Sequence, residues 1–390
     1  MIAVSTALDH LFALVHPTDI ETVALIDAAG RTLAQDIAAT RDQPPFAASA
    51  MDGYAIRASE AQPAAMFKVM GEAAAGHGWP GILGPGQAVR IFTGAPVPEG
   101  ADFVVIQEDV TRRGDLITLD PGMDSKDNIR PAGTDFSIGT TLAAPRVLAA
   151  QDIALLASMN VAAVPVRRKP VVAIMATGDE LVMPGESPGP DQIIASNSFG
   201  LHAMLAALGA DPRLLPIARD NVASLKTAFD LTEGADLILT IGGASVGDHD
   251  LVAGVAAELG MEQSFYKVAM RPGKPLMAGQ IKGTAMIGLP GNPVSAMVCG
   301  HVFAAPVLLA MLGHPAEPAA RLTAPLAIPL GPNGPREHYM RAHLHNGLIT
   351  ASDRQDSSLL TVLAASNALL VRPPDDPAQE AGATVSYIPI

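Results

Sequence analysis

The pattern of apolar and polar positions changes twice along the chain. Between about residues 46 and 138, short apolar runs are broken by glycine and proline. This pattern predicts the strands of a small β-rich domain, at 67–70, 88–92, 103–107 and 116–119. On either side of it, apolar spacing predicts an N-terminal amphipathic helix around Leu8 and Leu11, a strand at 32–38 and a helix at 147–159. Asn160 is expected to end that helix in a left-handed conformation.

The clearest pattern begins after residues 165–170, which are interpreted as a basic, proline-bounded linker. Strands are predicted at 171–175, 213–217, 237–241, 265–268 and 285–289, and helices at 198–208, from 223, at 252–259 and at 294–312. Strands that alternate with helices predict a mostly parallel, doubly wound α/β sheet whose ligands bind beyond the carboxyl ends of the strands. After about residue 318 short strands and prolines return, which predicts a small β-rich C-terminal domain. The expected fold class is multidomain α/β.

Composition narrows the class of protein. Apolar residues make up 49% of the 390 residues and charged residues only 16%, which indicates a compact folded chain of several domains. The net charge of −14, with no long basic run to offset it, argues against nucleic acid or an anionic membrane as a partner. The single cysteine, Cys299, excludes an internal disulfide and is interpreted as a buried, inert thiol. The apolar stretch 294–312 is interrupted by His301 and Pro306, so we expect a core helix and a cytoplasmic protein.

Small, glycine-rich loops follow several of the predicted strands. The most informative is 239–250, where an apolar run stops at Gly242-Gly243 and continues through Ala244-Ser245-Val246-Gly247-Asp248-His249-Asp250. Bare backbone N–H groups in such a turn cradle an anion, and the aspartates add charge suited to a metal ion or a proton. Taken alone, a tight turn before an acidic helix start explains this segment equally well. Similar loops lie at 176–180, 195–198, 270–275 and 288–293.

Carboxylates in or beside loops are the second candidate feature: Asp52, Asp135, Glu180, Asp220 and Asp250. If several converge, their repulsion must be relieved by a divalent cation, by raised pKa values, or by both. A magnesium-like site of oxygen ligands fits better than zinc, because no second cysteine or paired histidine offers softer ligands. Each carboxylate alone is equally explained as a helix cap or a surface group, Asp220 above all.

Basic residues supply the opposite charge. Lys267 and Arg271 flank the end of a predicted strand, and the turn Pro272-Gly273-Lys274-Pro275 is rigid enough to present Lys274 outward. A rigid basic loop beside a glycine cradle is what a phosphate or oxyanion ligand requires. The alternative is a surface hairpin with a solvated lysine.

Together with Ser49-Ala50-Met51-Asp52-Gly53-Tyr54 and Ile91-Phe92-Thr93-Gly94-Ala95-Pro96, these loops resemble the motifs of the MoeA family over essentially the whole chain. Proteins of that family are molybdopterin molybdenumtransferases. The resemblance implies an elongated homodimer of four-domain chains. Its domains are expected at 1–45 with 139–168 (domain I), 46–138 (inserted β-rich domain II), 169–318 (α/β molybdopterin-binding domain III) and 319–390 (C-terminal β domain IV).

The resemblance also implies a reaction. The enzyme receives adenylated molybdopterin and molybdate, cleaves the phosphoanhydride, releases AMP and leaves molybdenum on the dithiolene sulfurs, with Mg²⁺ required. The molybdopterin adenylyltransferase and downstream molybdoenzymes are the implied protein partners. Phosphoanhydride cleavage mainly needs positioning and charge neutralisation, which basic groups and a cation supply.

Residue roles follow from the resemblance, motif by motif. The implied catalytic residues are Asp52, Thr93, Asp135, Glu180, Asp250, Lys267 and Arg271, and the implied metal ligands are Glu180, Asp220 and Asp250. The implied contacts to the pterin, phosphate and oxyanion are Gly178, Asp179, Ser196, Asn197, Gly242, Gly243, Ser245, Gly247, Asp248, Pro272, Gly273, Lys274, Pro290, Gly291, Asn292, Arg341 and Ser357. In a dimer, Asp52 and Thr93 are expected to complete the partner's cleft. Which carboxylate serves which role stays open.

Three positions depart from the family pattern. Arg271 stands where lysine is common, and Thr134 replaces a common acidic residue before Asp135. Asp356 precedes Ser357 where glycine is usual, which puts a negative charge where an oxyanion is expected. This last departure puts the contribution of the C-terminal domain in question.

Other functions fit parts of the chain. A molybdopterin adenylyltransferase has a single α/β domain resembling residues 170–318, but the inserted and C-terminal domains count against it. A carrier that stores the pterin without inserting metal is a blander reading, and tungstate is not distinguished from molybdate. A non-catalytic scaffold, known among animal relatives, does not need the acidic cluster that this chain retains.

Overall fold

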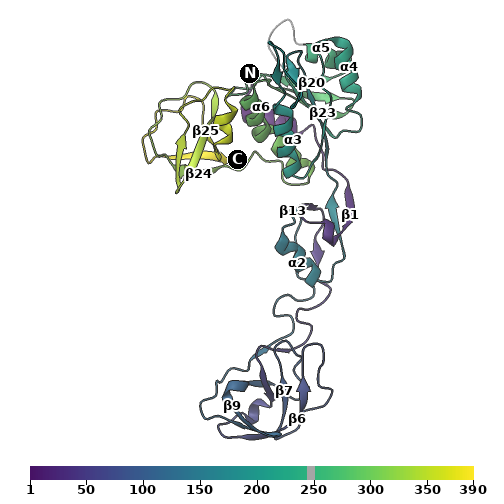
Figure 1. Cartoon of the computed structure of the whole chain (residues 1–390), viewed down its shortest axis with the longest axis vertical. Coiled ribbons are helices and arrows are strands. Elements are labelled where there is room, and N and C mark those ends of the chain that lie inside the picture. The colour runs from purple at the N-terminus through teal and green to yellow at the C-terminus, as the bar shows by residue number, and fades with distance from the viewer. Residues whose placement is uncertain (244–250) are drawn as a thin grey trace.

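The computed structural model describes residues 1–243 and 251–390, and it is strongly elongated (Figure 1). The α/β sheet and the C-terminal β structure lie side by side at one end. The inserted β structure lies at the other end, and a small linking sheet separates the two. Residues on the inserted structure are therefore far along the long axis from the carboxyl ends of the α/β sheet.

The central sheet of the α/β unit has six strands, in the order β18 (Asp211–Leu214), β15 (Val171–Ala176), β19 (Leu237–Ile241), β23 (Thr284–Leu289), β22 (Met277–Ile281) and β20 (Glu262–Tyr266). The first four run parallel, and β22 and β20 add an antiparallel edge. The predicted mostly parallel sheet is confirmed. The carboxyl ends of β15, β19 and β23 lie next to one another.

Helices cover both faces of this sheet because its strands alternate in period 2 between two cores. On β19, Leu237, Leu239 and Ile241 pack into one core and Ile238 into the other. The first core includes α1 (Val4–Phe12), α3 (Asn197–Ala207), α6 (Pro293–Cys299) and α7 (Ala305–Met311); the second includes α4 (Val222–Asp230) and α5 (Leu251–Glu258). The sheet is therefore doubly wound. The sequence analysis groups residues 1–45 with 139–168, whereas α1 packs in the α/β core.

The last helix of this unit packs in the first of these two cores. Helices α6 and α7 are joined by a π-helical turn at Gly300–Ala304, so residues Pro293–Met311 form one helix. By length and composition it is the one segment among the described residues that is able to cross a membrane. Because 78% of its most apolar window is buried inside the protein, the predicted core helix is confirmed, and Cys299 is buried as predicted. Burial raises the pKa of the Cys299 thiol, which keeps it protonated and unreactive.

The linking sheet contains two corrections to the sequence analysis. Only residues 168–170 of the predicted linker 165–170 connect the two sheets. Residues 165–167 belong to β14 (Ala163–Arg167), which pairs along its whole length with β1 (Ile20–Ala24), and Val164 and Val166 are buried. Pro165 is tolerated because its carbonyl oxygen accepts from Ala34 N, so its nitrogen faces the side where only one residue pair is formed. The sheet also contains β2 (Thr32–Leu33) and β13 (Arg146–Val147), and α2 (Ala150–Ser158) packs on it. Asn160 has a φ of 64°, as predicted.

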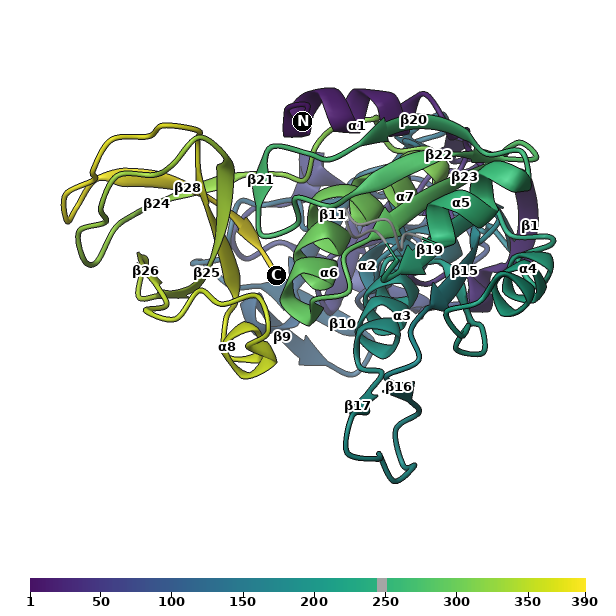
Figure 2. The ribbon, with the colours of Figure 1, turned by 90° about the horizontal axis from the view of Figure 1, so that it is seen from above.

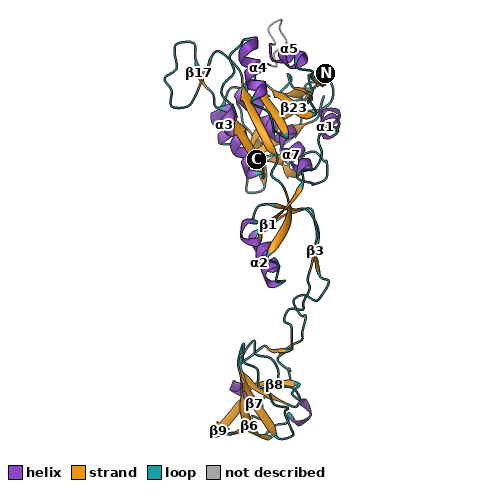
Figure 3. Cartoon of the chain, turned by 90° about the vertical axis from the view of Figure 1, so that its right-hand side faces the viewer, coloured by secondary structure: helices purple, strands orange, loops and turns teal. Residues whose placement is uncertain are grey.

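The predicted strand 32–38 is also wrong, because the chain leaves the linking sheet after Leu33. It continues as β3 (Ile37–Ala38), which pairs with β12 (Thr141–Leu142), and β4 (Ala48–Ser49), which pairs with β11 (Ile129–Arg130). These two paired ribbons carry the chain to the inserted domain and back (Figure 3).

Two predicted strands of the α/β unit are shifted, and a third strand was not predicted. The strand predicted at 213–217 is β18 (Asp211–Leu214), and the one predicted at 265–268 is β20 (Glu262–Tyr266). The latter ends early because Lys267 adopts a positive φ of 74°. Strand β22 was not predicted; it forms a hairpin with β23 through Lys282 and Gly283, both with positive φ.

The inserted domain is a six-stranded sheet in the order β8 (Phe103–Ile106), β5 (Gly53–Ile56), β7 (Gln87–Ile91), β6 (Met66–Ala73), β10 (Leu116–Leu119) and β9 (Val110–Arg113). Its small cores are built from alternating apolar residues, as the short runs predicted. Gly53 is required where β5 crosses β8, because a Cβ there would lie 1.9 Å from the carbonyl oxygen of Val105.

The C-terminal sheet is joined directly to the α/β unit. Its strands are β25 (Glu337–His345), β27 (Ala368–Arg372), β28 (Thr384–Pro389), β24 (Leu322–Pro325) and β26 (Leu348–Ala351), with α8 (Leu360–Ala364) beside them. A two-residue strand from the α/β unit, β21 (Met270–Arg271), pairs in parallel with β25 at its edge (Figure 2). Tyr339 and Leu369 also belong to the α/β core. The joint is therefore held by both backbone pairing and apolar packing.

Asp236 provides a test of how the linking sheet is attached to the α/β sheet. Its carboxylate accepts from both terminal nitrogens of Arg168 at 2.8 Å and from Val171 N at 2.7 Å. Burial raises the pKa of Asp236, but the bonds from Arg168 and Val171 outweigh it and lower the pKa overall. We expect Asp236→Asn to destabilise the chain by about 1–2 kcal/mol in urea unfolding at pH 7.

The pH dependence of this loss follows from the lowered pKa. The stabilisation by Asp236 is complete above about pH 4 and disappears as the pH falls through the pKa of the folded state. The difference between wild type and Asp236→Asn should therefore shrink in acid. Lys226→Gln, which removes an exposed ion pair with Glu258, is the control and should change little. Equal losses in both variants at pH 7 would contradict this account.

Candidate functional site

A cavity of about 830 Å³ lies where the carboxyl ends of β15, β19 and β23 meet. Each strand ends in a loop that contributes small residues to the wall: Thr177 and Gly178 after β15, Gly242 and Gly243 after β19, and Pro290 and Gly291 after β23. Open α/β sheets bind ligands at this position. At Gly242 the φ is +90° and a Cβ would lie 2.8 Å from Thr177 O, so only glycine leaves the wall this close.

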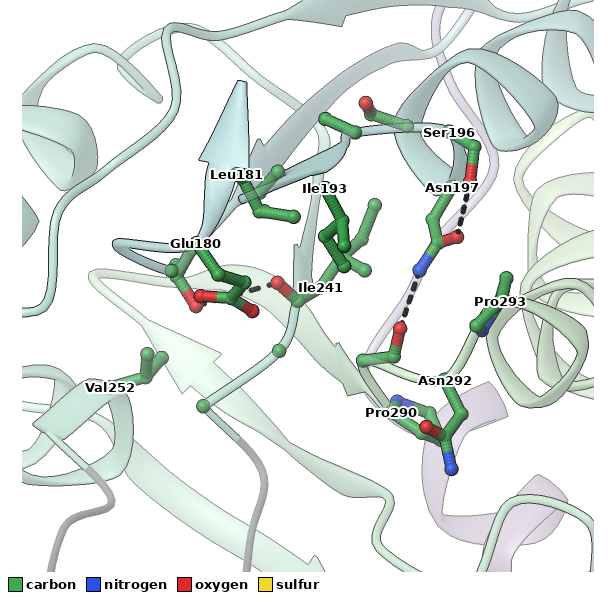
Figure 4. Close-up of a pocket in the computed structure, with 18 of the residues that line it drawn as sticks. Glu180, Leu181, Ile193, Ser196, Asn197, Ile241, Val252, Pro290, Asn292 and Pro293 are labelled. Carbon is green, nitrogen blue, oxygen red and sulfur yellow. Dashed lines mark hydrogen bonds between the residues drawn. The ribbon is translucent and has the colours of Figure 1, made fainter. Parts of the chain in front are cut away.

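Two helix N-termini face the cavity. Ser196 and Asn197 stand at the start of α3, and Asn292 and Pro293 stand at the start of α6. Figure 4 shows Asn197 bridging the two loops, with its Nδ2 donating to Gly291 O at 2.7 Å. Unpaired N–H groups and the helix dipole make a terminus such as that of α3 favourable for phosphate or other anions; at α6, Pro293 has no N–H and Val294 N donates to Ser357 O, so there the helix dipole contributes.

Two carboxylates line the same cavity, Glu180 and Asp220. Within the described residues neither forms a salt bridge. Glu180 lies over Gly178, at which a Cβ would be 2.2 Å from its Oε2. Asp179 does not line the cavity; its Oδ1 accepts from Asp220 N at 3.2 Å and so fixes the Asp220 loop. The structure thus brings together two of the three residues expected to bind metal.

The third expected ligand, Asp250, lies outside the described residues, as do Ser245, Gly247 and Asp248. In the part of the chain that the structure describes, no group of three or more His, Cys, Asp or Glu side chains is arranged to hold a metal ion.

The predicted site residues of the inserted domain do not line the cavity. Asp52 Oδ1 accepts from both the backbone N and Oγ1 of Thr93, each at 2.8 Å. These two bonds, the backbone one first, lower the pKa of Asp52 and keep it ionised at neutral pH. Asp135 is exposed on the ribbon that leads back from this domain, where its N donates to Gln43 O. Within one chain, the linking sheet lies between the cavity and the inserted domain that contains Asp52 and Thr93 (Figure 1).

The predicted basic loop has two faces. Pro272 and Gly273 are buried and do not line the cavity; a Cβ on Gly273 would lie 2.5 Å from Cys299 Sγ. Arg271 and Lys274 are exposed, as the rigid-turn argument expects, while Pro275 lines the cavity. Lys267 Nζ instead lies over the ring of Tyr266, 5.1 Å from its centroid.

Unpaired positive charge is buried beside this loop. Arg341 on β25 is 0% exposed; its Nη2 donates to Asp356 O at 3.0 Å, but its Nε and Nη1 have no partner among the described residues. Burial and then the charge of Arg271 lower its pKa. Burying N–H groups of a cation without acceptors is costly, so this position favours an anion.

Neighbouring His338 reports the same electrostatics. It pairs across strands with Arg271 on one side and Arg372 on the other, and its Nε2 is buried without a partner among the described residues. Burial, followed by the charge of Arg271, lowers its pKa to about 4. The imidazole is therefore neutral at pH 7, because burial, and then the surrounding arginines, disfavour a positive charge there.

The C-terminal loop 355–358 connects this cation to the cavity. Ser357 Oγ accepts from Asn292 Nδ2 at 3.1 Å, Ser357 O accepts from Val294 N at 3.0 Å, and Ser358 lines the cavity. The Asp356 carboxylate, which the sequence analysis treated as a foreign charge, accepts from the N and Oγ of Ser358. The side-chain bond from Ser358 contributes most to lowering the pKa of Asp356. The carboxylate therefore acts as a local turn cap.

The sequence analysis missed the apolar wall of the cavity. Leu181, Ile193, Ile194, Leu251 and Val252 line it, from strands β16 (Leu181–Val182) and β17 (Ile193–Ile194) and from α5. In sequence they look like ordinary core positions. Ile193 is nevertheless 59% exposed, and the loop between β16 and β17 projects from the body (Figures 2 and 3). The glycine- and proline-rich composition of residues 183–192 was the available signal.

Comparison with known protein families gives three successive matches. Residues 2–160 match the MoeA N-terminal region (domains I and II), residues 173–310 match a probable molybdopterin-binding domain, and residues 323–390 match the MoeA C-terminal region (domain IV). Together these matches cover most of the chain.

Individual relatives agree with these matches. A molybdopterin molybdenumtransferase of Nostoc is 37% identical over 91% of this chain and 85% of its own length, and one of Bacillus subtilis is 34% identical over 94% and 89%. The crystal structure of a molybdopterin biosynthesis MoeA protein from Pyrococcus horikoshii superposes with a TM-score of 0.86, at 28% identity and with full coverage of both chains. On this evidence of sequence and fold, the chain belongs to the MoeA family.

Proposed function

We propose that this chain inserts molybdate into adenylated molybdopterin and releases AMP. Its family makes it a transferase of molybdenum cofactor biosynthesis, and the proposal concerns the step itself. The observation that carries it is the cavity at the ends of β15, β19 and β23, with anion-binding helix N-termini and two carboxylates in its wall. A pterin phosphate fits such a mixture of small, apolar and polar lining residues.

The oxyanion is proposed to bind beside this cavity, at Arg341. The free N–H groups of its guanidinium lack acceptors among the described residues, and the exposed Arg271 adds charge nearby. A tetrahedral oxyanion supplies several acceptor oxygens and two negative charges to such a position. Ser357 and Ser358 connect Arg341 to the cavity wall, which supports a short path between oxyanion and pterin.

Mg²⁺ is proposed to bind at Glu180 and Asp220. Their carboxylates are hard oxygen donors without a salt bridge in the described residues, and Mg²⁺ is typically held by one or two carboxylates together with substrate phosphates and water. When bound, the ion neutralises phosphate charge. The carboxylates orient it, and the glycine loops and helix termini position the phosphoanhydride.

The reaction itself is tested by AMP release. With Mg²⁺ and adenylated molybdopterin, the wild-type chain is expected to release AMP only when molybdate is added, because phosphoanhydride cleavage is proposed to depend on the bound oxyanion. High-performance chromatography of AMP measures this directly. Tight pterin binding without AMP release under any condition would indicate a carrier instead.

The metal proposal predicts a shifted Mg²⁺ requirement. Glu180→Gln and Asp220→Asn keep side-chain shape but remove a charged ligand. Each should raise the Mg²⁺ concentration for half-maximal AMP release by at least roughly tenfold. That is the loss typical when a group that only supports a metal ligand is removed, and a direct ligand should cost no less. Asp191→Asn is the matched control, since Asp191 is exposed on the loop between β16 and β17 and does not line the cavity. Wild-type Mg²⁺ dependence in both cavity variants would exclude these ligands.

We also propose that the active unit is a homodimer in which Asp52 and Thr93 of one chain serve the cavity of the other. Support comes from the elongated shape, which separates Asp52 from the cavity of its own chain (Figure 1). At a Mg²⁺ concentration that saturates the wild type but not Glu180→Gln, Asp52→Ala and Glu180→Gln should each release little AMP alone. Mixed, unfolded and refolded together in equal amounts, they should regain about a quarter of the wild-type sites, because only heterodimers contain one intact site.

This complementation distinguishes the arrangements sharply. If Asp52 acts on its own chain, every site in the mixture carries one lesion and no activity returns. Sedimentation measurements on the same mixture show whether dimers form. A mixture that is dimeric but inactive would overturn the shared site.

A further inference from the structure

The side-chain amide of Gln355 occupies a place in the C-terminal sheet that a backbone pair would normally fill. Strands β25 and β26 pair from His345 and Leu348 up to Ala342 and Ala351. At the next step Ser352 N still donates to Arg341 O at 2.9 Å, but the return bond is not made. Instead Arg341 N donates to Gln355 Oε1 at 3.0 Å, and Gln355 Nε2 donates to Ser352 O at 2.7 Å and to Arg341 O at 2.9 Å.

The amide of Gln355 and the N–H of Ser352 together satisfy the backbone N–H and C=O of Arg341, and the Gln355 side chain replaces one of the two backbone bonds of the pair. One amide group makes three hydrogen bonds, which is most of its capacity. The residue after Gln355 then supplies the carbonyl oxygen that accepts from Arg341 Nη2. Residues 355 and 356 therefore hold Arg341 at both ends, by its backbone and by its guanidinium.

We propose that Gln355 is a positioning residue for the oxyanion substrate, acting by fixing the backbone from which Arg341 projects. The proposal rests on the proposed function, because it takes the unpaired Nε and Nη1 of Arg341 as the oxyanion contact. Arg341 is fully buried and carries two unpaired nitrogens, so its guanidinium has no alternative protein acceptor among the described residues to guide it. The pairing with β27 and the bond from Ser352 N hold part of its backbone; Gln355 supplies the acceptor for Arg341 N and a second donor to Arg341 O, and Asp356 O holds the guanidinium.

We call a side-chain amide that bonds both the N–H and the C=O of one backbone residue a clamp. A second clamp on β25, at Leu344, provides the control. Asn367 Oδ1 accepts from the N–H of Leu344 on β25 at 2.7 Å, and Asn367 Nδ2 donates to Leu344 O at 3.0 Å. Leu344 does not line the cavity and carries no charge. Either substitution removes a side-chain amide that bonds the backbone of β25. Only the Gln355 clamp holds a residue whose cationic N–H groups are unpaired within the described residues.

The experiment measures molybdate dependence in the full-length chain. For wild type, Gln355→Ala, Gln355→Glu and Asn367→Ala, AMP release is followed against molybdate and separately against adenylated molybdopterin, and direct molybdate binding is measured by equilibrium dialysis. Gln355→Glu keeps the acceptor but loses the donor bonds to Arg341 O and Ser352 O, so it tests the clamp with little change of volume. Thermal unfolding of each variant checks folding.

We expect both Gln355 variants to raise the molybdate KM and the molybdate Kd roughly tenfold, as misplaced binding groups do, with the KM for adenylated molybdopterin unchanged. Asn367→Ala should lower Tm similarly and leave both KM values unchanged. In an Arg341→Ala background, Gln355→Ala should cause no additional loss of molybdate affinity, because both changes act through one guanidinium.

The possible failures are distinguishable. If Arg341→Ala leaves molybdate affinity unchanged, the proposed oxyanion site is wrong and the role of Gln355 falls with it. If Arg341→Ala weakens molybdate binding while the folded Gln355 variants bind it normally, the oxyanion site stands and Gln355 is not a positioning residue. Equal changes in both KM values, or the same effect on the molybdate KM from Asn367→Ala, would show that Gln355 only stabilises the fold and does not position Arg341.

Discussion

The parallel pairing of Met270–Arg271 with Glu337 and His338 fixes the C-terminal sheet against the carboxyl edge of the α/β sheet. Glu337 N donates to Ala269 O, and Tyr339 and Leu369 continue the α/β core across the joint. Apolar burial alone sets distance but not direction, whereas backbone hydrogen bonds set both. The loop with Ser357 and Ser358 consequently reaches the N-terminus of α6, and Arg341 is enclosed beside the cavity rather than left on a separate domain.

The joint also concentrates charge in a chain that is acidic overall. The net charge is −14, yet Arg271, Arg336, Arg341 and Arg372 all act on the pKa of His338. Arg372 is neutralised by Asp376, while Arg341 has no carboxylate partner in the described residues. The cavity itself has the opposite character, because Glu180 and Asp220 line it and neither forms a salt bridge within the described residues. In the proposed function, Mg²⁺ would offset the charge of the two carboxylates at one end of the site, and the oxyanion would offset the charge of Arg341 at the other.

Sequence reasoning predicted the central sheet well because buried parallel strands leave long apolar runs such as 237–241, and each of their loops carries glycine or proline. It failed where tertiary pairing overrides a local signal. Pro165 and the basic residues after it suggest a linker, yet Val164 and Val166 are buried in a strand that tolerates proline because its pairing with β2 is limited to one residue pair. The glycine loops of the cavity were predicted as candidates, whereas the Gln355 clamp was not, because a polar side chain that replaces one ladder pair has no periodicity to reveal it.

Asp52 and the cavity are separated along the length of one chain. Its carboxylate is held by Thr93 and ionised, which is a fixed arrangement at the far end of the molecule from the cavity. Bending to bring the two ends together would have to deform this two-stranded connection, whose outgoing and returning strands are also cross-linked between the two ribbons, where Gln43 N donates to Phe136 O and Asp135 N donates to Gln43 O. A paired ribbon resists bending more than a single connection, because the motion breaks backbone hydrogen bonds. In the proposed homodimer, a second copy of the chain would bring the same carboxylate to the cavity without that cost, so the elongated shape supports the proposal of a shared site.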